Sequence, residues 1–217
     1  VATGDNKFFI VDENTVNEYS IPQKFLRPVL PSPKYVAGNV ILGAHDGSPL
    51  LPARQYLFTC GEDEERLKRD YPMVWKYIQS GIDRGVDGGY ICSRRSPWYL
   101  CEERKPAPIV VPYMGRAGGK GRLFRFILNN SKAITTNVYL LLYPKVNFAK
   151  CLKNKKLLAE VWHRLNLIPV DELMANGRSY GGGLNKLEPR ELMNVPVPGV
   201  AELMIPYEQG AEMSLFG

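Results

Sequence analysis

Basic, aromatic, glycine and asparagine side chains cluster in the middle of this 217-residue chain, and together they suit contact with a polyanion. Residues 94–156 hold 14 basic and 2 acidic side chains, a net charge of +12, whereas residues 1–93 carry −2 and residues 157–217 carry −4. Arginine and lysine neutralise phosphates, arginine can fork onto guanine, and asparagine suits adenine edges. The block predicts a nucleic-acid contact, with a solvated surface as the plainer interpretation.

Individual contacts follow from these residue types. Arginines precede a Trp-Tyr pair, and the loop GRAGGKGR (115–122) combines three cations with four glycines, which let a backbone approach a groove without Cβ clashes. Short polar side chains follow at 129–132. The residues expected to contact DNA are Arg94, Arg95, Trp98, Tyr99, Arg116, Lys120, Arg122, Arg125, Asn129, Asn130 and Lys132, with Arg178 and Lys186 beyond the block.

Three consecutive glycines, Gly181 to Gly183, stand between those last two cations. Glycine loses more conformational freedom on folding than any other residue, so three in a row indicate a structural or functional need. A sharp turn after Tyr180 is the favoured interpretation. The alternative is a backbone that approaches DNA, with Arg178 and Lys186 on phosphates.

No catalytic constellation is found. The only histidines are His45 and His163, no nucleophile elbow or HExxH motif occurs, and GRAGGKGR does not fit the P-loop pattern. One enzymatic alternative stays open, a metal-dependent nuclease using carboxylates, although the Asp-then-Glu-x-Lys pattern is missing. The carboxylates in question are Asp83, Asp87, Glu102 and Glu103. Another alternative is a protein-interaction module whose basic stretch meets an acidic partner.

The elements that must position these side chains follow from periodicity. β-Branched and aromatic residues predict strands, and apolar residues spaced by three and four predict helices. Strands are expected at 7–11, 35–42, 54–60, 109–114, 123–128 and 134–143. Helices are expected at 62–82, interrupted by Pro72, at 148–165, and from Pro189. Together these predict a single α+β domain over residues 1–217, with a mixed or antiparallel sheet and flanking helices.

Location and completeness can be addressed only as expectations. No apolar run approaches the length of a membrane span, and the start shows no signal-peptide pattern, so a cytoplasmic protein without membrane contact is expected. The chain begins at Val1, which suggests a fragment of a longer protein.

Four stretches carry a family resemblance. They are TGDNKFF (3–9), SPWYLCEERKPAPIVVPYMGR (96–116), FRFILNNSKAITTNVYLLLYPK (124–145) and RSYGGGLNKLEPRELMNVPV (178–197). In this order they resemble the C-terminal target-recognition region of adenine-specific N6 DNA methyltransferases of restriction-modification systems, with a TaqI-like specificity domain. The last two stretches are quite specific, and the four together extend over nearly the whole chain.

The resemblance implies a role in DNA recognition without catalysis. In that family an N-terminal domain binds S-adenosylmethionine and grips the flipped adenine with an Asn-Pro-Pro-Tyr-type motif. This chain has no Pro-Pro dipeptide and no glycine-rich cofactor motif after a strand. The implied partners are double-stranded DNA and the catalytic domain of the same parent protein, with no catalytic residue, metal or cofactor in this chain. The recognition domain would clamp the duplex while the adenine leaves the stack.

Overall fold

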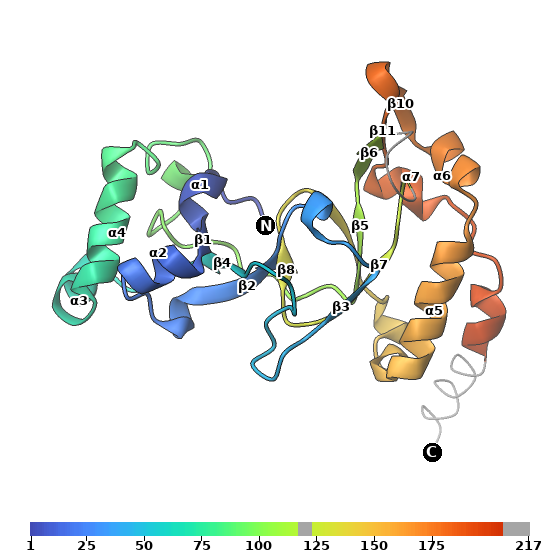
Figure 1. The fold of residues 1–217 in the computed structure, drawn as a ribbon, viewed down its shortest axis with the longest axis horizontal. Coiled ribbons are helices and arrows are strands. Elements are labelled where there is room, and N and C mark those ends of the chain that lie inside the picture. Colours follow the sequence, from blue (N-terminus) through green and yellow to red (C-terminus); the bar gives the residue numbers. More distant parts are fainter. Residues whose placement is uncertain (117–122, 206–217) are drawn as a thin grey trace. The chain divides into compact units, whose positions relative to one another are not determined.

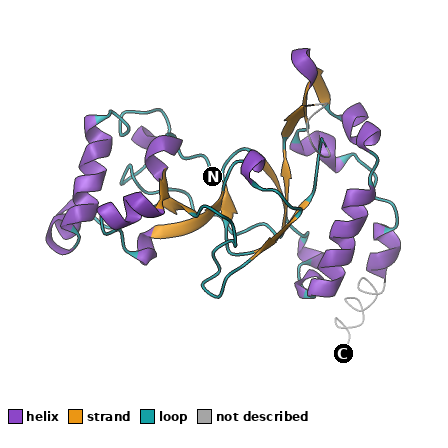
Figure 2. Cartoon of the chain, in the orientation of Figure 1, coloured by secondary structure: helices purple, strands orange, loops and turns teal. Residues whose placement is uncertain are grey.

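A computed structural model describes residues 1–116 and 123–205, and the chain forms two compact units whose segments alternate along the sequence (Figure 1). Unit 1 comprises Val1–Val36, Ile41–Pro106 and Asn130–Asn137, and unit 2 comprises Ala37–Val40, Ala107–Asn129 and Val138–Gly217. Each unit combines helices with antiparallel or mixed sheet (Figure 2). The predicted α+β class is therefore confirmed, and the outer boundaries 1–217 stay a prediction.

Unit 1 is built on a four-stranded sheet of order β1-β4-β2-β8. Its strands are β1 (Ile10–Asp12), β2 (Leu26–Leu30), β4 (Gln55–Phe58) and β8 (Ile134–Thr135). The pairs β1–β4 and β2–β4 are antiparallel, whereas β2 and β8 run parallel with Val29 opposite Ile134. A short segment far along the chain thus completes a sheet that begins near residue 10.

Unit 1 contains four α-helices among its described residues, and the first three begin after an aspartate that caps them. The four helices are α1 (Asn6–Phe9), α2 (Glu13–Glu18), α3 (Glu64–Asp70) and α4 (Pro72–Asp83). The carboxylates of Asp5, Asp12 and Asp63 each accept a hydrogen bond from the backbone N–H of the residue three positions later, as N-cap residues do. The predicted interruption at Pro72 is confirmed, because proline occupies the first turn of α4.

Aromatic rings form the core of unit 1. Phe8 stacks on Tyr77 with ring centroids 4.8 Å apart, and it packs edge-on against Phe9 at 4.9 Å. Trp98 closes this cluster with its ring 5.1 Å from that of Phe8. A Cβ atom at Gly81 would lie 2.6 Å from the Phe8 ring, so only glycine lets α4 pack this closely. The cluster fixes α1 and α4 against the sheet.

Unit 2 contains most of a four-stranded sheet of order β3-β7-β5-β9, of which Ile41, Leu42 and Asn130 belong to unit 1, and the whole of a three-stranded sheet of order β10-β11-β6. The first sheet consists of β3 (Val40–Leu42), β5 (Ile109–Pro112), β7 (Ile127–Asn130) and β9 (Tyr139–Leu142). The second consists of β6 (Met114–Arg116), β10 (Arg178–Tyr180) and β11 (Leu184–Lys186). Its three strands lie side by side, and both of its pairs are antiparallel (Figure 1).

Unit 2 also contains the helices α5 (Lys155–Leu167), α6 (Val170–Asn176) and α7 (Pro189–Met193). Phe124, Phe126 and Leu187 are fully buried in its core. The indole N–H of Trp162 and the side-chain amide of Asn166, both on α5, donate to the carbonyl of Phe126 at 2.8 and 3.1 Å. These bonds tie α5 to the segment that enters β7.

Several predicted boundaries are wrong for local reasons. Residues 7–9 are helical because Asp5 caps α1, so the predicted strand at 7–11 begins only at Ile10. The predicted strand at 134–143 is two strands, β8 and β9, which lie in different sheets. The predicted helix at 148–165 begins at Lys155, since the Asn154 side chain accepts from two backbone N–H groups there.

Other short elements were not predicted. They include the strands β2, β10 and β11, the helices α2 and α6, and six single-turn 3-10 helices. These 3-10 helices span Gln23–Phe25, Pro33–Tyr35, Cys92–Arg94, Val146–Phe148, Cys151–Lys153 and Gly181–Gly183. Among residues 1–116 and 123–205, no helix is long and apolar enough to cross a membrane.

Candidate nucleic-acid interface

The three-stranded sheet of unit 2 brings three of the predicted cations, Arg116, Arg178 and Lys186, to one face. Its register places Arg178 opposite Lys186, Lys186 opposite Met114, and Leu184 between Tyr180 and Arg116. Side chains two residues apart point to the same side of a strand, so these residues share a face. We call the face formed by Met114, Arg116, Arg178, Tyr180, Leu184 and Lys186 the outer face.

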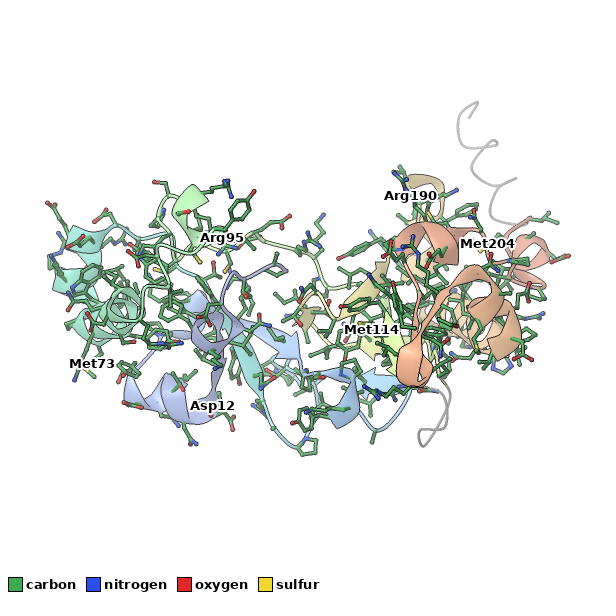
Figure 3. All side chains as sticks on the ribbon, turned by 90° about the horizontal axis from the view of Figure 1, so that it is seen from above. Asp12, Met73, Arg95, Met114, Arg190 and Met204 are labelled. Carbon is green, nitrogen blue, oxygen red and sulfur yellow. The ribbon has the colours of Figure 1, made fainter. Side chains whose placement is uncertain are left out.

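Solvent reaches this outer face. Met114 and Tyr180 are 38% and 47% exposed, and Arg116 and Arg178 are exposed too (Figure 3 labels Met114). On the opposite face, Asn185 of the middle strand is 4% exposed, whereas Ser179 of β10 is exposed and its hydroxyl donates a 2.6 Å hydrogen bond to Asn185. The sheet is thus anchored in the unit through β11, and its outer face presents cations, an aromatic ring and two apolar side chains to solvent.

The triple glycine joins β10 to β11 as a hairpin turn. Gly182 and Gly183 have φ values of 71° and 70°, in the left-handed region that L-residues with a Cβ atom avoid. A Cβ atom at Gly181 or Gly182 would meet no atom within 4 Å, so neither glycine is required by a close neighbour. The predicted turn is confirmed. The approach of this backbone to DNA stays a prediction.

Two of the three cations on the outer face are ion-paired. Arg178 Nε lies 2.8 Å from Glu191 Oε1, and Lys186 Nζ lies 2.8 Å from Glu188 Oε1. The hydrogen bond to Glu191 raises the pKa of Arg178, and the hydrogen bond from Lys186 lowers the pKa of Glu188. Within the part of the chain that the structure describes, Arg116 makes no ion pair.

Arg116 also marks where the glycine-rich loop leaves the sheet. It ends β6, and its Cα partner Leu184 begins β11 directly after the glycine turn. Residues 117–122, which include the predicted contacts Lys120 and Arg122, lie outside the described residues. The start of the loop and the hairpin turn therefore lie at the same end of the three-stranded sheet.

The predicted cations of residues 94–99 lie in unit 1 and make local contacts. Arg94 stacks its guanidinium 3.4 Å from the centroid of the exposed Tyr90 ring. Arg95 donates to the carbonyls of Thr3 and Ala2 at 2.9 and 2.6 Å (Figure 3). Arg94 thus faces solvent, whereas Arg95 links this segment to residues 2 and 3 of the chain.

Of the predicted aromatic contacts, Tyr99 is a core residue and Trp98 is half-buried against the core. Trp98 packs against Phe8 and Phe9. Tyr99 is 4% exposed, and its hydroxyl donates to the carbonyl of Glu62 at 2.9 Å. Burial raises the pKa of Tyr99 to about 12. Both rings have a packing role, and DNA contact by either stays a prediction.

The remaining predicted residues divide between support and exposure. Arg125 donates to the carbonyl of Gly38 at 2.9 Å, and burial lowers its pKa. Asn129 is buried, and its amide donates to the carbonyl of Ala107 at 3.2 Å. Asn130 and Lys132 are exposed, and the stem of Lys132 packs against Gly47. DNA contact by these four residues stays a prediction as well.

The carboxylates considered for a nuclease site are partly engaged by arginines. Glu102 pairs with Arg104 at 3.2 Å, and Glu103 pairs with Arg27 at 3.0 Å. No group of three or more histidine, cysteine or acidic side chains is arranged to hold a metal ion in residues 1–116 and 123–205. These observations give the nuclease hypothesis no structural support.

Two cavities of similar volume differ in chemistry. Unit 2 has a cavity of about 480 Å³ between β9 and helices α5 and α7, and its lining contains no charged side chain. Unit 1 has a cavity of about 540 Å³ whose lining includes Arg27, Arg104, Glu102 and Glu103. S-adenosylmethionine carries a sulfonium, an amino group and a carboxylate. The first cavity offers them no counter-charge. In the second, Glu102 and Glu103 pair with arginines, and the Asp46 carboxylate lies 3.8 Å from the Arg54 guanidinium. The absence of a cofactor from this chain stays a prediction.

The outer face contains three residues that the sequence reasoning missed: Tyr180, Leu184 and Met114. The alternation of Arg178-Ser179-Tyr180 and Leu184-Asn185-Lys186 about a glycine turn is typical of a hairpin and could have revealed the first two. Met114 joins them only through the pairing of β6 with β11, which is not encoded locally.

Comparison with known proteins places this architecture in a family context. The family model described as "Type II methyltransferase M.Eco57I, C-terminal domain" matches residues 1–213. The chain is 27% identical over 205 residues to the type II methyltransferase M.AccI of Acinetobacter calcoaceticus, covering 88% of this chain and 33% of that protein. It is 25% identical over 201 residues to the type II methyltransferase M.XamI of Xanthomonas campestris pv. amaranthicola, covering 93% and 34%. The chain thus spans about a third of the length of these relatives.

Proposed function

This chain belongs to the family of type II methyltransferase M.Eco57I C-terminal domains, and we propose that it supplies DNA recognition to an adenine-specific N6 methyltransferase of a restriction-modification system. The observation that carries the proposal is the outer face, which presents Arg116, Arg178, Lys186 and Tyr180 on a sheet anchored from behind. The family membership supports the enzyme class. The residue types support DNA as the ligand.

The outer face has the chemistry that duplex DNA requires. Cations neutralise backbone phosphates and release counterions, which supplies most of the affinity of sequence-independent binding. Tyr180, Leu184 and Met114 add apolar and aromatic surface, which can contact sugars, bases and thymine methyl groups. A sheet fixes the positions of these side chains relative to one another. Phosphate contacts can therefore set the register of the protein on the duplex, so that the same side chains face the same base pairs.

Catalysis would lie outside this chain. S-adenosylmethionine and the flipped adenine would be held by a separate catalytic domain of the parent enzyme, in the cytoplasm, while this chain positions the duplex. In an enzyme that joins the two parts, mass spectrometry of the methylated nucleosides is expected to show N6-methyladenine. A methylated cytosine as the product would overturn the adenine assignment.

DNA binding is tested by a salt titration of the chain with a duplex of random sequence. If about six phosphates are neutralised, the logarithm of the binding constant should fall with a slope of about −5 in the logarithm of the salt concentration. Arg116→Ala should weaken binding and make the slope shallower by about 0.9, because one phosphate contact is lost.

The matched control is Arg66→Ala, which removes a cation of α3 that is paired with Glu62 and Asp70. It should leave the slope unchanged. A slope near zero for the unaltered chain would refute DNA binding by phosphate contacts. An equal effect of both substitutions would refute the assignment to the outer face.

A further inference from the structure

Four charged side chains form one network at the outer face. Arg178 and Lys186 from the hairpin pair with Glu191 and Glu188 from the start of α7, each at 2.8 Å. The second carboxylate oxygen of Glu191 accepts a 2.7 Å hydrogen bond from the backbone N–H of Glu188. The network is electrically balanced, with two cations and two anions.

The carboxylate of Glu191 is fixed in place by the helix that it helps to cap. Glu188 is the N-cap residue of α7, and its backbone N–H donates to the Glu191 carboxylate. This bond satisfies one of the N–H groups that no helical carbonyl can reach. Glu191 therefore cannot leave Arg178 by a simple rotamer change without losing this cap, and Glu188 is held by its ion pair with Lys186.

A paired cation and an unpaired one respond differently to a phosphate. An unpaired arginine gains the full attraction of the phosphate and releases a counterion from the DNA. A cation already held by a carboxylate must give up that partner, so an arbitrary phosphate offers it little net gain. Arg116 is of the first kind among the described residues, and Arg178 and Lys186 are of the second.

We infer that Glu188 and Glu191 are specificity-determining residues, which hold Arg178 and Lys186 in register on the outer face and withhold them from arbitrary phosphates. This inference rests on the proposed function. Specificity is a difference between two affinities, and a device that weakens binding to wrong sequences raises it as effectively as a new contact to the right one. The two glutamates weaken sequence-independent binding. The correct DNA sequence offers Arg178 and Lys186 additional contacts, which compensate for the loss of their ion pairs with the glutamates.

The test replaces both carboxylates by amides, Glu188→Gln/Glu191→Gln, in the 217-residue chain. Glutamine keeps an acceptor for the capping hydrogen bonds but removes the charge. Binding is measured to a random duplex and to a duplex selected by the unaltered chain from a randomised library. Affinity for the random duplex should rise about five- to tenfold, with a slope steeper by about 1 to 2, because up to two more cations become available. Affinity for the selected duplex should rise less.

The matched control is Glu160→Gln/Glu202→Gln, which makes the same change in net charge on other helical residues of unit 2. It should change neither affinity by more than about twofold, since neither residue belongs to the outer face, although Glu160→Gln also frees a cation, Arg164, from its ion pair. Equal gains for the two double variants would show a bulk charge effect and overturn the inference. A folded Glu188→Gln/Glu191→Gln variant with unchanged or weaker random-duplex binding would overturn it too.

A second variant keeps the inference testable if α7 does not tolerate the amides, which circular dichroism would show. Arg178→Ala/Lys186→Ala should weaken binding to the random duplex less than Arg116→Ala does, yet weaken binding to the selected duplex more. The reverse order would overturn the inference and leave DNA recognition standing. If the unaltered chain binds no duplex even at low salt, the proposed function fails, and the inference fails with it.

Discussion

Residues 94–99 and the outer face contain the same types of residue in different environments. Both combine predicted cations with a tyrosine, two cations in the first region and three in the second. In the first, Tyr99 is 4% exposed and Arg95 donates to backbone carbonyls. In the second, Tyr180 is 47% exposed and the cations Arg178 and Lys186 are held by carboxylates on the surface.

The contrast shows that a basic-aromatic composition does not by itself identify a contact surface. Arginine carries five donors, and these bind carbonyl oxygens inside a protein as well as phosphates outside it. What separates the two regions is the backbone beneath them. An aromatic ring in a segment packed onto a core becomes part of that core, whereas a ring on the free side of an anchored hairpin stays in solvent.

Among substitutions that compare the two regions, Tyr99→Ala is expected to have the largest effect on the free energy of unfolding. The substitution removes a buried ring and leaves the Glu62 carbonyl without its hydroxyl donor. Loss of a buried aromatic side chain costs about 3 to 5 kcal/mol, so the free energy of unfolding should fall by an amount in that range. Urea unfolding measures it. A folded, equally stable variant that has lost DNA binding would instead make Tyr99 a contact residue.

A smaller effect is expected from Arg95→Lys. Lysine keeps the charge but cannot reproduce the two hydrogen bonds that the guanidinium donates to Thr3 and Ala2. Hydrogen bonds from a charged group contribute about 1.5 to 3 kcal/mol, and lysine recovers part of this, so a loss of about 1 kcal/mol is expected. The salt dependence of DNA binding should not change. A shallower salt slope with intact stability would place Arg95 on phosphate.

The sequence predicted the parts of this molecule that depend on local chemistry. Pro72 divides two helices, Pro189 begins α7 and the triple glycine makes a turn, because φ restrictions and glycine freedom act within a few residues. The α+β class was predicted from strand-forming stretches and from apolar residues spaced by three and four, which are also local patterns.

The candidate surface could be predicted only in part, because it depends on pairing between distant segments. Met114 and Arg116 join Tyr180 through the β6–β11 ladder, across nearly 70 residues of chain. The pairing of Lys186 with Glu188, and of Arg178 with Glu191, depends on the short segment between β11 and α7. Residue types therefore predicted the cations of this surface, but they could not show which of them carry a partner.

The hairpin turn offers an internally controlled test of the outer face. Gly182→Ala places a Cβ atom at φ 71°, which costs about 1 kcal/mol or more, whereas Gly181→Ala adds a methyl group in open space without a positive φ. Gly182→Ala should therefore lower the free energy of unfolding by about 1 kcal/mol, and Gly181→Ala should leave it nearly unchanged. Thermal unfolding of the pair measures the difference. Equal costs would mean that the turn has another geometry.

The smallest effect on stability is expected from Tyr180→Ala, and it is the direct counterpart of Tyr99→Ala. Substitutions at exposed positions without special contacts change the free energy of unfolding by about 0.5 kcal/mol or less. Affinity for duplex DNA should nevertheless fall about three- to tenfold, because the ring is the largest aromatic surface on the outer face. Binding titrations at one fixed salt concentration measure this.

Tyr180→Phe separates the ring from its hydroxyl. If the ring contributes by packing against sugars or bases, phenylalanine should bind DNA within about twofold of the unaltered chain, since only the polar handle is lost. A loss as large as that of alanine would assign the contribution to the hydroxyl, as a donor to phosphate or a base edge. An unchanged affinity of both variants would mean that only the cations of the outer face contact DNA. The exposure of a tyrosine would then not indicate DNA contact in this chain.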